Sequence, residues 1–198
     1  MRVTFPRLPD HERAYALVER DDGAQYRLYG GKAGPRLPHD IVHFVVEREL
    51  GIPDGIWGGI AAGVVFESMR HVGGRRPPHA AERSRELLAD FRTRGLRAEL
   101  LADLVGCVAL LDHPSELDIL SLAATRLSVL SDADADVDPA AIAAAAVALQ
   151  VEASRWARLR VGEELSYEWP SPRGARRTRA RKPRIVRPDK KRRGRRPA

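Results

Sequence analysis

The sequence predicts an α+β protein that is mostly helical, in which a helical bundle packs against a small antiparallel sheet. Within residues 2–29, alternating apolar residues on both sides of Asp22-Gly23 predict a β-hairpin. The long middle part of the chain has apolar residues at helical spacing, which predicts the bundle. Alternation returns over residues 159–169, and we expect this C-terminal strand to complete the sheet beside the N-terminal hairpin.

The first two helices are expected after a loop rich in Gly and Pro at residues 30–38. Pro38 suits a first helical position, and Gly51 suits a helix end, so one helix is predicted between them. Residues 55–71 place four glycines among Ile, Val and Phe. Glycine lowers helix propensity but lets another backbone come close, so this segment predicts a buried helix with tight crossings. A loop is expected at residues 71–78.

Further helices are delimited by local signals. Gly95 is expected to separate two of them, Ser115 and Asp118 form a capping-box pattern, and Asp138 precedes a proline as an N-cap. An acidic solvated linker is expected at 131–138, and a strand or hairpin over 156–170. The expected helices are residues 79–94, residues 96–112, a segment beginning at Ser115, and residues 139–156.

Charge divides the 198 residues into two parts. Residues 171–198 hold 14 Lys and Arg and one acid, Asp189, for a net charge of +13, whereas residues 1–170 carry a net charge of −6. The basic part has only Ile185 and Val186 as sizeable apolar residues, too few to offset the entropic cost of ordering its backbone. The sequence therefore predicts one globular domain over 1–170 and a disordered basic tail over 171–198.

Composition also excludes several classes of protein. Cys107 is the one cysteine, so an internal disulfide, a CxxC zinc ribbon and a redox dithiol are excluded, and a buried structural thiol is favoured over a nucleophile. Uncharged stretches do not exceed 13 residues, which is too short to span a bilayer. The N-terminal residues have no apolar region typical of a secretory signal, so a cytoplasmic protein is expected. Glycine-rich phosphate loops and the GxSxG nucleophile elbow are also missing.

One motif indicates metal chemistry. His39 and His43 are four residues apart on the first expected helix, so both imidazoles lie on one side of it, as in the HExxH helices that bind zinc. Asp40 is a carboxylate beside them, suited to act as a base or a ligand. Glu67 and His71 repeat the same spacing on the glycine-rich segment. We therefore predict a divalent metal site, with Zn²⁺ favoured, formed by His39, His43, Glu67 and His71, with Asp40 as the catalytic group. The alternative is that this polar stripe is the solvent face of an amphipathic helix.

Two resemblances concern the same segment. The block LPHDIVHFVVE, with the later RLRVGEELSYEWP, resembles an uncharacterised family of small bacterial proteins with an LPHDxxHFxVE-like helix and a terminal LxxGExLxxxWP strand. The resemblance covers most of residues 1–170 and implies no known activity. The HDxxH segment is also similar to the zinc motif of a ubiquinone-biosynthesis protein family, in which a Glu follows after eleven residues. His39, Asp40 and His43 match that motif, but Gly55 stands at the Glu position.

The tail predicts non-specific binding of a polyanion, RNA or DNA, because clustered cations displace counterions from phosphates. Aromatic residues are not interleaved with these cations, so base recognition by the tail is not implied. Two alternatives are a merely solubilising extension and a contact of the tail with the acidic domain. The residues expected to bind are Arg176, Arg177, Arg179, Arg181, Lys182, Lys190, Lys191, Arg192, Arg193, Arg195 and Arg196.

A second class of function remains open beside a metal-dependent hydrolase. The chain fits a non-enzymatic adaptor as well, whose bundle docks a protein partner while the tail holds the pair near nucleic acid. This interpretation predicts an exposed apolar surface over residues 52–57.

Overall fold

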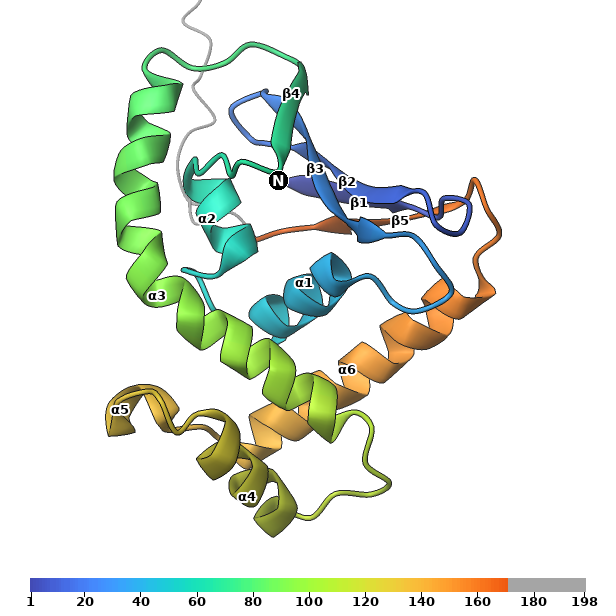
Figure 1. The fold of residues 1–198 in the computed structure, drawn as a ribbon, viewed down its shortest axis with the longest axis vertical. Helices are drawn as coiled ribbons and strands as arrows, with labels where there is room; N and C mark the ends of the chain where they lie inside the picture. Colours follow the sequence, from blue (N-terminus) through green and yellow to red (C-terminus); the bar gives the residue numbers. More distant parts are fainter. Residues whose placement is uncertain (171–198) are drawn as a thin grey trace, which may run out of the picture.

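The computed structural model describes the backbone of residues 1–170 and their side chains, apart from those of residues 90 and 92–94. A five-stranded antiparallel sheet carries the helices on one of its faces (Figure 1), which confirms the α+β class. The strands are β1 (Arg2–Pro6), β2 (Arg13–Glu19), β3 (Gln25–Lys32), β4 (Met69–Gly73) and β5 (Glu164–Glu168). The helices are α1 (His39–Glu49), α2 (Ile56–Ala62), α3 (Ala80–Val108), α4 (Glu116–Arg126), α5 (Asp132–Ala135) and α6 (Pro139–Arg158).

The sheet has the strand order β4-β3-β2-β1-β5. The hairpin between β2 and β3 turns at Asp22-Gly23, as predicted, with Gly23 in the left-handed region at φ +85°. The C-terminal strand lies beside β1, where Val3 faces Tyr167, so the expected place of this strand is confirmed as well. Both ends of the described chain are thus joined in one sheet.

Helix α1 lies at the centre of the core. Its residues Ile41, Phe44 and Val45 are fully buried. The ring of Phe44 packs edge to face against Phe5 of β1 and Trp57 of α2, at centroid distances of 6.2 and 5.4 Å. Since sheet and helices enclose α1 together, the core fixes the buried side chains of α1, while those at its two ends, such as His39 and Glu49, reach the surface.

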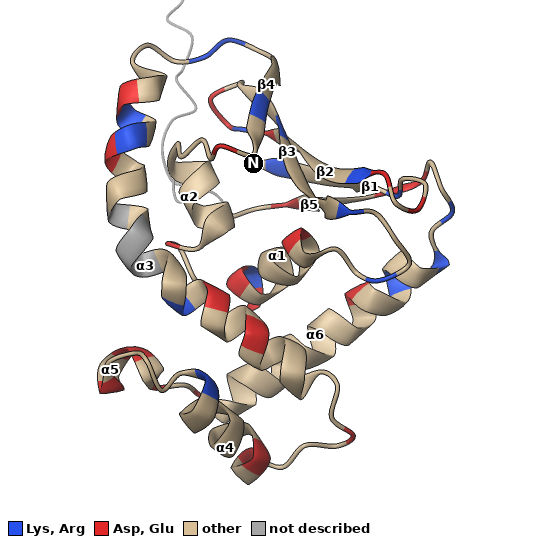
Figure 2. Cartoon of the chain, viewed as in Figure 1, with Lys and Arg blue, Asp and Glu red and all other residues tan. Residues whose placement is uncertain are grey.

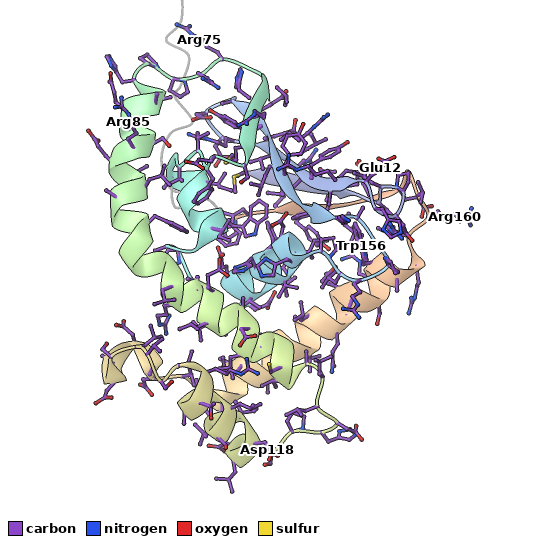
Figure 3. All side chains as sticks on the ribbon, viewed as in Figure 1. Glu12, Arg75, Arg85, Asp118, Trp156 and Arg160 are labelled. Atoms are coloured by element: carbon purple, nitrogen blue, oxygen red, sulfur yellow. The ribbon has the colours of Figure 1, made fainter. Side chains whose placement is uncertain are left out.

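Helix α6 also holds the loop that leads into α1. Trp156, near the end of α6, is buried, and its Nε1–H donates to the carbonyl oxygen of Gly34 at 3.3 Å (Figure 3). This bond fixes the loop just before His39, the first residue of α1.

The prediction of a single helix over residues 55–71 is wrong. Helix α2 ends at Ala62, because Gly63 adopts φ +129°, a conformation that ends a helix and that L side chains rarely adopt. The chain then turns and forms β4, which pairs with β3, in the region that the sequence assigned to a helix and a loop. Glycine disfavours a helix in this segment, and residues 69–73 make their backbone hydrogen bonds with β3 instead.

Three other boundaries differ from the prediction. Gly95 does not end a helix: it lies inside α3, next to the ring of Phe91, and the two expected helices are one. The acidic linker contains the short helix α5, capped by Ser131. The segment 156–170 is helical as far as Arg158, so its strand begins only at Glu164. In each case helical continuation satisfied backbone hydrogen bonds that a loop would have left to water.

The predicted caps of α4 and α6 are confirmed. Ser115 accepts a hydrogen bond from the backbone N–H of Asp118, and the Asp118 carboxylate accepts one from the Ser115 N–H, which is a full capping box (Asp118 is labelled in Figure 3). The Asp138 side chain accepts from the Ala140 N–H, ahead of Pro139 in the first turn of α6.

The exposed apolar surface expected over residues 52–57 is wrong. Ile52 is 5% exposed and Trp57 is fully buried, because α2 folds back onto α1. The most exposed large apolar side chains of the described residues include Leu110, Leu117 and Val129, at 87, 77 and 71%. Leu110 lies just after α3, Leu117 on α4 and Val129 after α4.

Among the described residues, no helix is long and apolar enough to cross a membrane. The eleven Arg and Lys residues expected to bind nucleic acid lie in 171–198, outside the described residues.

Candidate metal centre

The two histidines of the HDxxH motif lie one above the other on α1. Their ring centroids are 4.5 Å apart, with an angle of 64° between the planes. His39, in the first turn, is exposed, whereas His43, one turn later, is fully buried. The pair therefore runs from the surface into the core, with one imidazole accessible to solvent and one enclosed by protein.

A glutamate from α3 completes the group. Glu99 Oε2 lies 3.1 Å from Nε2 of His43. The ligand atoms of His39, His43 and Glu99 all lie within 4.8 Å of one another. A Zn²⁺ ion bound tetrahedrally at about 2.0–2.1 Å holds its ligand atoms roughly 3.4 Å apart. Small side-chain rotations therefore suffice for the three groups to share one ion. Figure 2 shows acidic positions on the neighbouring parts of α1 and α3.

The buried imidazole of His43 lacks a hydrogen bond. Within the described part of the chain, neither Nδ1 nor Nε2 has a partner of acceptable geometry. Carboxylates nevertheless flank it, since Nδ1 lies 3.5 Å from Glu47 Oε1 and Nε2 lies beside Glu99. Burial alone lowers the pKa of His43, but the two carboxylates outweigh it and raise this pKa to about 9. His43 is thus held where a positive charge is stabilised, either a proton or a metal ion.

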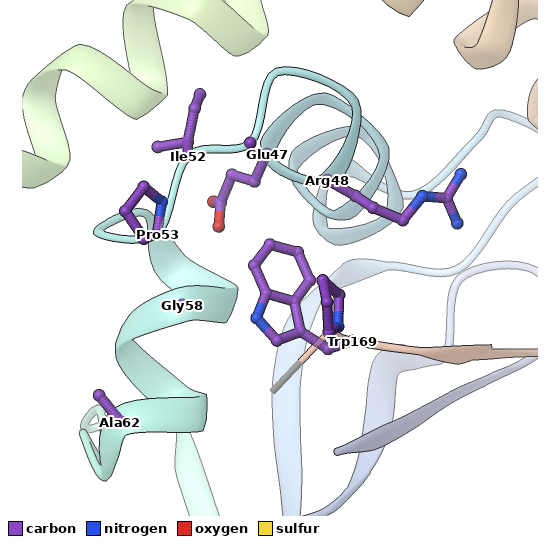
Figure 4. Close-up of a pocket in the computed structure, with 9 residues that line it drawn as sticks. Glu47, Arg48, Ile52, Pro53, Gly58, Ala62 and Trp169 are labelled. Atoms are coloured by element: carbon purple, nitrogen blue, oxygen red, sulfur yellow. The ribbon is translucent and has the colours of Figure 1, made fainter. Parts of the chain in front are cut away.

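Glu47, one turn after His43 on α1, is the second fully buried polar residue of this region. Its side chain is fully buried, and its carboxylate oxygens accept hydrogen bonds from the backbone N–H groups of Ile56 and Trp57 at 2.8 and 2.9 Å. N–H groups at the beginning of a helix have no acceptor within the helix, so Glu47 supplies one for α2. Its negative charge also complements the helix dipole. Figure 4 shows the Glu47 carboxylate pointing from α1 toward α2, at one side of a pocket of about 260 Å³ that Trp169 also lines.

Gly55 makes room for this carboxylate. A Cβ at position 55 would lie 2.2 Å from Cδ of Glu47. The carboxylate of Glu47 thus occupies the space that a side chain at position 55 would need.

A Gly55→Ala substitution is expected to lower the free energy of unfolding by about 1–3 kcal/mol, since the φ of −77° suits alanine but the contact with Glu47 does not. Gly106→Ala is the matched control. It lies in α3 with nothing within 4 Å of an added Cβ, so it should raise stability by up to about 1 kcal/mol. Urea denaturation measures both, and equal effects of the two substitutions would contradict the contact with Glu47.

Asp40 occupies the first turn of α1 on the side of the sheet. Its Oδ2 lies 2.6 Å from the place of a Cβ on Gly30, which is part of β3. Burial raises the pKa of Asp40, while the nearby His39 and His43 lower it to a smaller extent. Asp40 is therefore close to both histidines, but it is not a member of the three-residue group.

A pocket reaches this centre at His39. Its volume is about 390 Å³, and its lining includes His39, Asp40, Lys32 and Arg36. Among the described residues, neither of these two cations has an ion pair with a carboxylate. The pocket therefore brings free positive charge next to an accessible imidazole.

The structure does not bring Glu67 and His71 to the histidines of α1. The helix that was expected to present them is missing, so Glu67 lies exposed in the turn before β4 and His71 lies on β4. Nε2 of His71 is 3.1 Å from the carbonyl oxygen of Gly74, and its ring packs edge to face against Tyr26. Glu99 holds the position by His43 that the prediction gave to Glu67.

Sequence reasoning missed Glu99 because nothing local distinguishes it. It is one of several acids on the polar side of α3, and only the packing of α3 against α1 places it by His43. Glu47 did leave a signal, since it stands four residues after His43 on an otherwise buried helix and eight residues before a glycine that opens the next one.

Comparisons of the chain with protein-family models, with curated proteins and with solved structures found no match. The chemical interpretation of the site therefore rests on its geometry, and both resemblances of the HDxxH segment stay predictions.

Proposed function

We propose that this protein binds a divalent metal ion, with Zn²⁺ favoured, through His39, His43 and Glu99. The observation that carries the proposal is the buried His43, whose ring nitrogens lack hydrogen bonds within the described residues while an imidazole and a carboxylate lie beside it. Two His and one Glu are a ligand set of catalytic zinc sites, which keep a further position open for water or substrate. The exposure of His39 and Glu99 supports an open position here.

The reaction that we propose is metal-dependent hydrolysis. A bound Zn²⁺ makes a water molecule nucleophilic near neutral pH. Asp40, whose raised pKa favours proton uptake, is our candidate for the base. The pocket at His39 offers the space for a small substrate, and Lys32 and Arg36 favour one that carries negative charge.

Zinc affinity tests the proposal. Purified protein is expected to bind about one equivalent of Zn²⁺ in calorimetry. Glu99→Ala should lower the affinity at least about 100-fold, because it removes a ligand and not merely an outer partner of one. Glu67→Ala is the matched control, since Glu67 is an exposed glutamate of the same chain outside the group.

Two results would count against the proposal. One is binding of less than a tenth of an equivalent of Zn²⁺, Mn²⁺, Fe²⁺ or Ni²⁺. The other is an equal loss of affinity in the two glutamate variants, which would place the metal elsewhere.

For the tail, we propose a separate and non-specific role in binding the phosphates of RNA or DNA. Its support is composition alone, 14 basic residues against one acid in residues 171–198. The adaptor hypothesis keeps this tail but loses its expected docking surface, because residues 52 and 57 are buried.

A further inference from the structure

The open face of the sheet carries a group of aromatic and cationic side chains that the metal centre does not use. Helices pack on the other face (Figure 1), and inward residues such as Ala16, Val18 and Leu28 are buried. The side chains that alternate with them on β2, β3 and β4 lie on the open face. We call Arg13, Tyr15, Arg27, Tyr29 and Arg70 the tyrosine-arginine face.

The two tyrosines form the centre of this face. Tyr15 and Tyr29 are directly opposite each other on β2 and β3, with ring centroids 6.2 Å apart. Both are partly exposed. They form a pair of aromatic rings on the open face of the sheet.

Guanidinium groups stack on both rings. Arg13 lies over Tyr29 and Arg27 lies over Tyr15, with Cζ at 4.8 and 4.3 Å from the ring centroids. Arg70 stands directly opposite Arg27 on β4. A guanidinium plane held on an aromatic ring is itself a surface on which a nucleobase stacks.

These cations lack acidic partners. Within the part of the chain that the structure describes, none of Arg13, Arg27 and Arg70 forms an ion pair. In the same residues, the buried Nε of Arg27 has no hydrogen-bond partner. Arg2, on β1 beside β5, is paired with Glu168, so the unpaired arginines of this face lie on β2, β3 and β4.

We propose that the tyrosine-arginine face binds single-stranded RNA, with bases stacked on the tyrosine and guanidinium planes and phosphates held by the three arginines. Unpaired cations complement a phosphate backbone, and π-faces accept bases of any sequence. In a duplex the base faces are stacked on one another, so a duplex would bind this face through its phosphates alone. The phenol hydroxyls add hydrogen bonds to the ribose 2′-hydroxyl, which DNA lacks. The proposal stands on the sheet alone and does not depend on the metal.

The test compares normal and abasic RNA on the full chain. Fluorescence anisotropy measures binding of an oligouridylate of about ten nucleotides and of an abasic oligomer with the same phosphates. A Tyr15→Leu/Tyr29→Leu variant should bind oligouridylate at least tenfold more weakly and the abasic oligomer equally well, because base stacking is lost and phosphate binding is not. The abasic oligomer measures what phosphate binding by the tail and by the three arginines contributes together, since it presents charge without bases.

A Tyr15→Phe/Tyr29→Phe variant is the matched control. It keeps both rings, so it should bind oligouridylate within about threefold of the wild type while losing the preference over oligothymidylate. Circular dichroism establishes that all variants are folded.

Three results would overturn the proposal. The first is unchanged oligouridylate binding in the leucine variant. The second is an equal loss of affinity for the abasic oligomer in the leucine variant, which would show that the face binds through charge alone. The third is wild-type binding of oligothymidylate as tight as that of oligouridylate, which would remove the assignment to RNA.

Discussion

Replacing Glu47 with alanine is expected to lower the free energy of unfolding by about 3–5 kcal/mol. The substitution leaves the N–H groups of Ile56 and Trp57 without their acceptor at the beginning of α2. A buried donor that loses its partner costs about 1–3 kcal/mol, and the cavity and the uncompensated His43 add to this. Urea denaturation followed by tryptophan fluorescence measures the loss.

The matched control is Glu49→Ala on the same helix. Glu49 is exposed and bonds only to its neighbour Arg48 among the described residues, so its removal should change stability by less than about 0.5 kcal/mol. Similar losses for the two glutamates would show that the carboxylate of Glu47 does not hold α2.

Zinc is expected to stabilise the wild-type protein strongly and a His43→Asn variant not at all. A ligand that binds only the folded state at about 1,000 times its Kd raises the free energy of unfolding by about 4 kcal/mol. His43 is the central member of the proposed ligand group, so its loss should remove this gain. Because each protein is compared with and without zinc, any destabilisation caused by the substitution itself cancels.

His71→Asn is the control, since His71 lies on β4 outside the group, and it should keep the full gain in stability from zinc.

The pH dependence of zinc binding gives a second measurement. With a pKa of about 9, His43 carries a proton at pH 7 that the metal must displace. The apparent zinc affinity should therefore rise by about tenfold per unit between pH 6 and 8. Stabilisation by zinc that survives in His43→Asn would place the ion at another site.

The fold was predictable where the signal was local. Asp22-Gly23, the capping box at Ser115 and Asp138-Pro139 each bring their own hydrogen bonds or backbone preference, and all three are where the sequence placed them. Residues 63–73 were not predictable in this way. Their glycine content weakens a helix without specifying the strand, and β4 forms because β3 offers it an edge to pair with.

In the candidate site, too, the local arrangement was predictable and the contact between distant segments was not. His39 and His43 are four residues apart on one helix, so their proximity follows from helical geometry alone. Glu99 lies 56 residues further along the chain from His43, and its place depends on how α3 crosses α1. Residues 67 and 71 showed the same spacing as the histidines, but that spacing has meaning only on a helix, and the segment is not helical there.

The contact between Glu47 and Gly55 also has an evolutionary consequence. In one order of events, a lineage gains a side chain at position 55 before the side chain at position 47 becomes shorter. It then passes through a protein in which the new side chain clashes with the Glu47 carboxylate. A lineage that shortens position 47 first passes through one with unpaired donors at the beginning of α2. Because both single steps are costly, we expect descendants that keep α2 in this place either to keep both residues or to exchange both together.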